Sequence, residues 1–184
     1  PAAVYWHAGT KAEVLALVSE RVIQEIELPA DHLDWQDWIL DLGLRVRRVL
    51  GSHPRFASYF ITHIQISGRM LVLADATIGT LARAGFRDQE LVDAYNAMFG
   101  AAFSWTAGEF AEELDGGGDG LAEIESRLAT AGNEEFAHVR AHWPVVADRV
   151  YAVRWSSGRT RPMDASFERM LRVLIAGFAA RLAT

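Results

Sequence analysis

Residues 1–18 read PAAVYWHAGTKAEVLALV and contain a helix end, a tight corner and a helix start in quick succession. Gly9 suits the end of a helix because glycine adopts a left-handed backbone conformation without a Cβ clash. Thr10 can cap the following helix through its hydroxyl group, and Glu13, three residues later, completes the pattern of a capping box. The stretch therefore predicts the last turns of one helix, a tight turn, and a new helix that begins at Lys11.

Apolar residues recur at helical spacing along nearly all of the chain, and no alternation typical of a strand hairpin is present. The pattern therefore predicts an all-α fold, with Pro29 ending the helix that begins at Lys11, Asp34 capping the next, and Gly85 ending a later one. The expected helices span about residues 11–28, 34–50, 54–64, 67–84, 89–114, 121–131, 134–147 and 163–182, with loops at 115–120 and 155–162.

The composition bounds the kind of protein. A chain of 184 residues that is 51% hydrophobic can bury one sizeable core. No apolar run reaches the length of about 18 residues that a membrane span needs, and no signal peptide is visible. The absence of cysteine excludes disulfides and thiolate metal sites, and it suits a cytoplasmic protein. A net charge of −6 argues against a broad nucleic-acid-binding surface on these residues.

The run Val4-Tyr5-Trp6-His7, the turn after it and Lys11 resemble the end of the DNA-binding domain in the TetR family of bacterial regulators. In that family the recognition helix ends in a similar aromatic and histidine run, and a lysine opens the next helix. The resemblance implies that the chain begins within the recognition helix, with most of the N-terminal helix-turn-helix absent. It assigns residues 1–28 to the end of the DNA-binding head and residues 29–184 to a ligand-binding and dimerisation domain.

The same resemblance implies a set of DNA-binding residues at the start of the chain. Phosphate contacts position a recognition helix in the major groove, and tyrosine, histidine and lysine side chains can supply them. The implied residues are Tyr5, Trp6, His7 and Lys11, with Trp6 expected to wedge the recognition helix against the next helix. The alternative is that the aromatic run is only a packing cluster.

The resemblance also implies a ligand pocket among the helices of residues 11–114, where large apolar side chains are interspersed with a few polar groups. An apolar cavity with a few orienting polar groups is typical of a small-molecule site. The polar candidates are His63, Gln65, Thr77 and Asn96. The predicted ligand-binding residues are Trp38, Phe60, His63, Met70, Tyr95, Met98, Phe99 and Phe103. Each of the apolar ones could equally belong to an ordinary core.

The last predicted helix, residues 163–182, is apolar on more than one side and therefore needs a cover on both. It could be a central core helix, because apolar stripes usually pack internally. The resemblance instead favours a homodimer in which this helix and that of residues 89–114 form a four-helix bundle across a twofold axis. The predicted interface residues are Phe110, Phe167, Met170, Leu171, Leu174 and Phe178.

Catalytic and metal-binding patterns are weak. Glu134, His138 and His142 are spaced four residues apart, but a di-iron bundle needs a second such motif, which the sequence lacks. No G-x-S-x-G, phosphate-binding loop or H-E-x-x-H pattern is present. We therefore predict no enzyme, no metal and no cofactor.

The resemblance thus predicts a TetR-like, ligand-responsive transcriptional regulator that acts as a cytoplasmic homodimer. It is expected to be a repressor that a small, largely apolar ligand releases from operator DNA, and it should not bind membranes. The alternatives are a helical ligand-binding or dimerisation module without a DNA role, and an enzyme built on a helical bundle.

Overall fold

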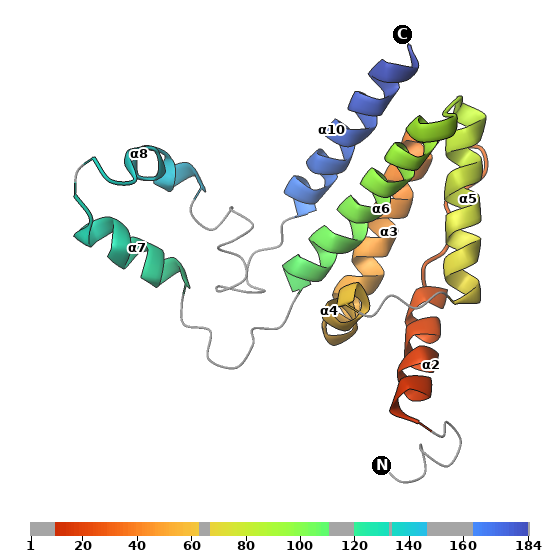
Figure 1. Cartoon of the computed structure of the whole chain (residues 1–184), viewed down its shortest axis with the longest axis horizontal. Helices are drawn as coiled ribbons and strands as arrows, with labels where there is room; N and C mark the ends of the chain where they lie inside the picture. Colours follow the sequence, from red (N-terminus) through yellow and green to blue (C-terminus); the bar gives the residue numbers. More distant parts are fainter. Residues whose placement is uncertain (1–9, 63–66, 111–119, 133, 147–163, 184) are drawn as a thin grey trace.

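The computed structural model describes residues 10–62, 67–110, 120–132, 134–146 and 164–183. These residues form helices and connections, and no strand occurs among them. The predicted all-α fold is therefore confirmed. In chain order the helices are α2 (Lys11–Gln24), α3 (Trp35–Ser52), α4 (Pro54–Thr62), α5 (Gly68–Ala84), α6 (Asp88–Phe110), α7 (Gly120–Thr130), α8 (Ala137–Val146) and α10 (Asp164–Leu182) (Figure 1).

The start of α2 has the predicted capping box. The backbone N–H of Glu13 donates to the hydroxyl of Thr10 over 3.2 Å, and the backbone N–H of Thr10 donates to the carboxylate of Glu13 over 2.8 Å. Two donors that the first helical turn cannot pair internally are satisfied in this way. The local sequence therefore determines where this helix begins.

The end of α2 differs from the prediction, because the helix stops at Gln24 and not near Leu28. The Ile26 side chain is fully buried in the core, and its carbonyl accepts a hydrogen bond from the Arg69 side chain of α5. In a helix that ended at Leu28 this carbonyl would be among the last four, which have no partner within the helix. In the observed structure the helix ends earlier, and the chain after it buries Ile26 and pairs its carbonyl with α5.

The other predicted helix boundaries agree more closely. The Asp34 carboxylate accepts from the backbone N–H of Asp37 over 2.9 Å and caps α3. The Ser67 hydroxyl caps α5 by accepting from the backbone N–H of Met70 over 3.2 Å. Gly85 ends α5 with a φ of +115°, a conformation that side chains other than glycine rarely adopt.

α6 lies at the centre of the helical bundle, in contact with α3, α4, α5 and α10. α10 packs against α3 and α6, whereas α5 packs against α3, α6 and the C-terminal part of the bundle's first helix, α2 (Figure 1). Side chains from these helices form one apolar core. Its largest fully buried members are Phe60, Phe86, Phe167, Ile23, Ile26, Leu50, Leu81 and Leu171.

One junction among α3, α6 and α10 is closely packed, and we call Gly43, Arg47, Glu109, Phe167 and Leu171 the α10 joint. A Cβ atom added at Gly43 would lie 2.5 Å from a methyl carbon of Leu171, so the two helices approach as closely as glycine permits. Arg47 binds the fully buried Glu109 carboxylate through two hydrogen bonds of 2.8 and 2.7 Å. Its guanidinium also lies 5.4 Å from the ring centre of Phe167. The joint therefore fixes α10 against α3 and α6.

The predicted dimer interface needs correction at this joint. Phe167 and Leu171 are buried within the protomer itself, so they cannot form a surface for a second copy. Met170, Leu174 and Phe178 are half-buried and pack against the same core. Phe110 is half-buried beneath the Arg47 guanidinium, 5.4 Å from it. Periodicity identified the apolar face of α10 but could not say whether the cover was internal.

α7 and α8 lie to one side of the bundle in Figure 1, and α8 has no buried residue. α7 begins one residue before the predicted range 121–131, and α8 lies inside the predicted range 134–147. Among the described residues, no helix combines the length and apolar character needed to cross a membrane.

Candidate functional site

An apolar cavity lies between α3, α5 and α6, and α10 closes one end of it through Leu171. Its open volume is about 40 Å³, within about 530 Å³ of total space between the lining atoms. The lining residues are Ile39, Leu42, Gly43, Val46, Met70, Leu73, Ala74, Thr77, Tyr95, Met98, Phe99, Ala102, Phe103 and Leu171. The open volume holds only a few water molecules, so a larger occupant requires side chains to move.

Among the described residues that line the cavity, none is charged and two, Thr77 and Tyr95, are polar. The Thr77 hydroxyl donates a 2.7 Å hydrogen bond to the carbonyl of Leu73 in the preceding turn of α5, so its proton is already engaged. Burial raises the pKa of the Tyr95 phenol, which therefore remains a neutral donor throughout the physiological pH range. The Tyr95 hydroxyl is thus the lining group best suited to donate to a ligand.

One wall of the cavity is aromatic. The rings of Tyr95 and Phe99 stack with their centres 6.0 Å apart, and those of Phe99 and Phe103 stack at 4.4 Å. Phe60 lies behind this wall, 5.2 Å from Phe103. The spacing of four residues along α6 aligns the three wall rings on one helix face. Such a wall offers a flat apolar surface to a ligand.

The cavity also has flexible walls, because Met70 of α5 and Met98 of α6 both line it. Methionine has three rotatable bonds and no branch, so it fills irregular gaps and moves aside at low cost. These two side chains can therefore move aside and enlarge the small open volume.

The structure brings together five of the eight predicted ligand-binding residues: Met70, Tyr95, Met98, Phe99 and Phe103. Trp38 does not line the cavity, because the helical repeat turns it toward a separate surface cleft with Trp35 and Arg83. Phe60 is buried behind the aromatic wall, as described above. His63 and Gln65 lie outside the described residues, and Asn96 is exposed on α6.

The sequence analysis missed most of the α3 wall and the small residues that make space. It named Thr77 as a polar candidate but did not single out Ala74 or Ala102, which line the cavity. Ile39, Leu42 and Val46 lie at helical spacing on α3, and none of them was among the predicted ligand-binding residues. A cavity depends on which side chains are too small to meet, and periodicity carries no information about that.

Of the four predicted DNA-binding residues, the structure describes one. Tyr5, Trp6 and His7 lie outside the described residues, and Lys11 is exposed at the first position of α2. No group of three or more metal-binding side chains was found in the described ranges, where Glu134, His138 and His142 are all exposed. The site that the structure describes is therefore the cavity alone.

The fold and the cavity define a helical body with an apolar cavity between α3, α5 and α6. Residues 28–182 match the family model described as the Tetracyclin repressor-like, C-terminal domain. The chain therefore belongs to the TetR family of transcriptional regulators, which are not enzymes.

The relatives agree with this assignment. An HTH-type transcriptional regulator of Saccharopolyspora erythraea is 30% identical over 179 residues, which cover 96% of this chain and 70% of that protein. A possible TetR family regulator of Streptomyces coelicolor A3(2) has a similar structure, with a TM-score of 0.72, 25% identity, and coverage of 97% of this chain and 82% of that one.

Structures of ActR from Streptomyces coelicolor have the same fold. The apo form gives a TM-score of 0.73 at 19% identity, and the complex with actinorhodin gives 0.73 at 18%. In both cases the match covers 100% of this chain and 82% of the ActR chain.

Proposed function

We propose that this chain forms the effector-binding and dimerisation body of a cytoplasmic TetR-family repressor. A small, largely apolar effector enters the cavity between α3, α5 and α6 and releases the protein from its operator. The cavity carries this proposal, because it is enclosed by apolar side chains and lies on the helices next to α2.

The chemistry of the lining supports an uncharged and flat effector. A charged group would lose its hydration in a cavity that offers no counter-ion. The stacked rings of Tyr95, Phe99 and Phe103 favour a planar ligand, and the Tyr95 hydroxyl favours one with a hydrogen-bond acceptor. A fused-ring ketone has all three properties.

The ActR structures give further support, because they show a protein of this fold in complex with actinorhodin and with (S)-DNPA. The low identity limits this comparison to the fold, so effector specificity in this chain depends on its own lining.

A homodimer would use the outward face of α10. Val173 is 66% exposed, and the small residues Ala176, Gly177 and Ala180 are exposed on the same helix. This face differs from the one predicted on the family resemblance, because Phe167 and Leu171 belong to the α10 joint. Small side chains allow a second helix to approach closely, and a twofold axis would pair the face with itself.

The experiment measures binding of the full-length gene product to DNA from beside its own gene, by fluorescence anisotropy at several salt concentrations. We expect a dissociation constant below about 1 µM that rises steeply with salt, as phosphate contacts require. Adding 9-fluorenone, a neutral three-ring ketone, should release the DNA. Fluorene, which lacks the acceptor, should release it less well, and fluorenone-4-carboxylate should not release it.

DNA binding that does not exceed the non-specific background would contradict the regulator role at that site. Specific DNA binding with release by the carboxylate, but not by the neutral ketone, would contradict the proposed effector class.

A further inference from the structure

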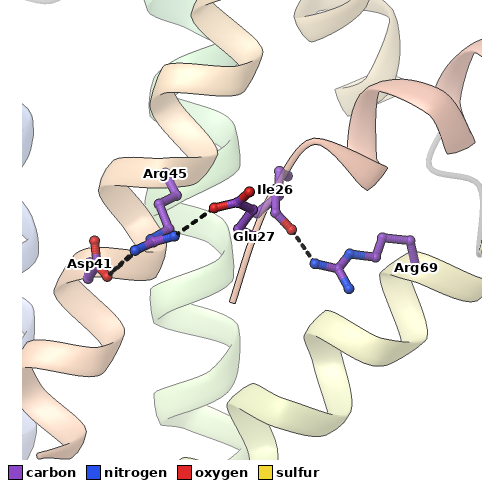
Figure 2. Close-up of polar contacts among 5 residues, drawn as sticks. All are labelled: Ile26, Glu27, Asp41, Arg45 and Arg69. Carbon is purple, nitrogen blue, oxygen red and sulfur yellow. Dashed lines mark hydrogen bonds and ion pairs between the residues drawn. The ribbon is translucent and has the colours of Figure 1, made fainter. Parts of the chain in front are cut away.

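Three consecutive residues between α2 and α3 are each held by a basic side chain, and we call residues 25–27 the strap. The Glu25 carboxylate lies 3.1 Å from Nε2 of His53, at the end of α3. The carbonyl of Ile26 accepts from Arg69 of α5, and the Glu27 carboxylate lies 3.5 Å from Arg45 of α3. Figure 2 shows Arg45 and Arg69 reaching the strap from opposite sides.

The contact between Arg69 of α5 and the Ile26 carbonyl is more deeply buried than the contact between Arg45 and Glu27. The Ile26 side chain is fully buried, so its carbonyl cannot move far without disturbing the core. The last turns of α2 also pack against α5. There a hydrogen bond from the Ser67 side chain lowers the pKa of Glu20, and the backbone and charge of Arg69 act in the same direction. Arg69 thus belongs to a contact that fixes the end of α2 against the N-terminus of α5.

The anchor on α3 is held in place by its own helix. Arg45 donates to the carboxylate of Asp41, one turn earlier, over 2.9 to 3.0 Å, and this hydrogen bond raises the pKa of the guanidinium. The Arg45 side chain is only 25% exposed, whereas Glu27 is 84% exposed. Asp41 therefore aims Arg45 at the strap, and the weaker contact to Glu27 is the one that can change.

The same helical turns also form the cavity. Arg69 directly precedes Met70, and Arg45 directly precedes Val46, and both Met70 and Val46 line the cavity. Because neighbouring residues of a helix point in different directions, each turn presents one side chain to the cavity and another to the strap. A change in the separation of α3 and α5 therefore acts on both.

We propose that Arg45 and Arg69 are positioning residues that transmit occupancy of the cavity to α2 through the strap. This inference rests on the proposed function and names its regulation. The α10 joint holds α3, so an occupant that widens the cavity moves α5 relative to α3. Because Arg45 on α3 and Arg69 on α5 both hold the strap, that displacement moves residues 25–27. α2 moves with them, since the strap directly follows its last residue. Coupling of this kind needs an element that both sites bias, and the strap supplies it.

The test supplies the occupant within the protein, so it does not depend on an identified ligand. Ala74 lines the cavity on α5, and Ala74→Phe fills it with a ring. Residues 1–184 contain no cysteine, so Leu17→Cys on α2 and Val92→Cys on α6, both at exposed positions, accept spin labels without competition from this part of the protein. Pulsed electron resonance then measures the distance between the two labels in full-length protein diluted with unlabelled copies.

Four backgrounds are compared: the parent, Ala74→Phe, the strap variant Arg45→Gln/Arg69→Met, and their combination. We expect Ala74→Phe to shift the label distance by about 1–2 Å, the size of helix shifts in other switches. In the strap background the same substitution should produce no shift. Arg45→Lys, which keeps the charge, should retain most of the response. The matched control Arg172→Gln removes an exposed ion pair of α10 and should leave the shift unchanged.

Equal shifts in the parent and strap backgrounds would overturn the proposal, and so would the absence of a shift in the parent background. If Ala74→Phe does not fold, as judged by circular dichroism, Ala102→Leu fills the cavity from α6 instead. Operator binding is measured on the same proteins. A strap-dependent shift of α2 without any change in DNA affinity would contradict the proposed function and leave the strap in place.

Discussion

The two sides of α3 differ in how closely their neighbours pack. Toward α10, the Leu171 side chain packs so closely on Gly43 that a Cβ atom there would clash with it. On the same side, Arg47 forms an ion pair with the fully buried Glu109. Toward α5, the side chains leave a cavity whose walls include methionine and alanine. The α10 joint therefore serves as a fixed reference, while the α5 side can yield. A small-molecule-responsive protein needs both, because a displacement is transmitted only relative to something that does not move.

The largest expected effect comes from breaking the ion pair of the α10 joint. Arg47→Met removes the bidentate partner of a fully buried carboxylate, and we expect the free energy of unfolding to fall by about 3–5 kcal/mol. Urea unfolding measures it. The double variant Arg47→Met/Glu109→Leu should lose less than Arg47→Met alone, since it buries no charge. A double variant that loses the sum of both single effects would show that the pair is not coupled.

A smaller effect tests how tightly the same joint is packed. Gly43→Ala places a methyl group 2.5 Å from a terminal methyl of the buried Leu171, which must shift to make room, so we expect a loss of about 1–3 kcal/mol. Gly100→Ala is the matched control in α6, where nothing lies within 4 Å of the added atom. It should stabilise the protein by about 0.5–1 kcal/mol. Equal effects in thermal unfolding would mean that the joint is no tighter than an open helix surface.

In the cavity on the α5 side of α3, Tyr95→Phe removes the hydroxyl group that can donate to a ligand and keeps the aromatic ring. We expect binding of 9-fluorenone to weaken about five- to tenfold, which corresponds to about 1 kcal/mol for one hydrogen bond. Fluorene has no acceptor, so its affinity should not change. Isothermal titration of both compounds gives the comparison, and an equal loss for both would assign Tyr95 a purely packing role.

The smallest effect is expected for an exposed ion pair that belongs neither to the α10 joint nor to the cavity. Arg172 and Glu168 form an i,i+4 ion pair on α10 with a nitrogen–oxygen distance of 2.7 Å, and both side chains are well exposed. Arg172→Gln should cost about 0.3–0.5 kcal/mol and lose even that in high salt. A cost near that of Arg47→Met would indicate that this face of α10 is covered in the assembled protein.

Much of the helical framework followed from local chemistry. Thr10 with Glu13, Asp34, Ser67 and Gly85 mark helix ends through contacts within a few residues of themselves, so a sequence pattern suffices to find them. The end of α2 could not be predicted in this way, because the Ile26 carbonyl after it accepts a hydrogen bond from a side chain 43 residues away. Long-range partners of this kind leave no local signal.

The candidate site followed only in part, for a related reason. The aromatic wall of Tyr95, Phe99 and Phe103 was predictable, since spacing along one helix aligns the rings. The opposite wall comes from α3 and α5, and the choice of Met70 over Trp38 depends on how those helices are rotated about their axes. Phe167 and Leu171 similarly changed from surface candidates to core residues once α3 and α6 were seen to cover them.

The sequence by itself determined the all-α class, most helix boundaries and, through the resemblance at Val4-Tyr5-Trp6-His7, a family that the comparison of residues 28–182 bears out. Caps, periodicity and short motifs act over one or two helical turns, so the residues involved lie close together in the sequence and can be found from it. Only the tertiary structure decided where α3 is locked, where it faces a cavity, and how Arg45 and Arg69 meet at residues 25–27. Those features depend on the packing of helices that are distant in the chain, and packing is set by shape and volume in three dimensions.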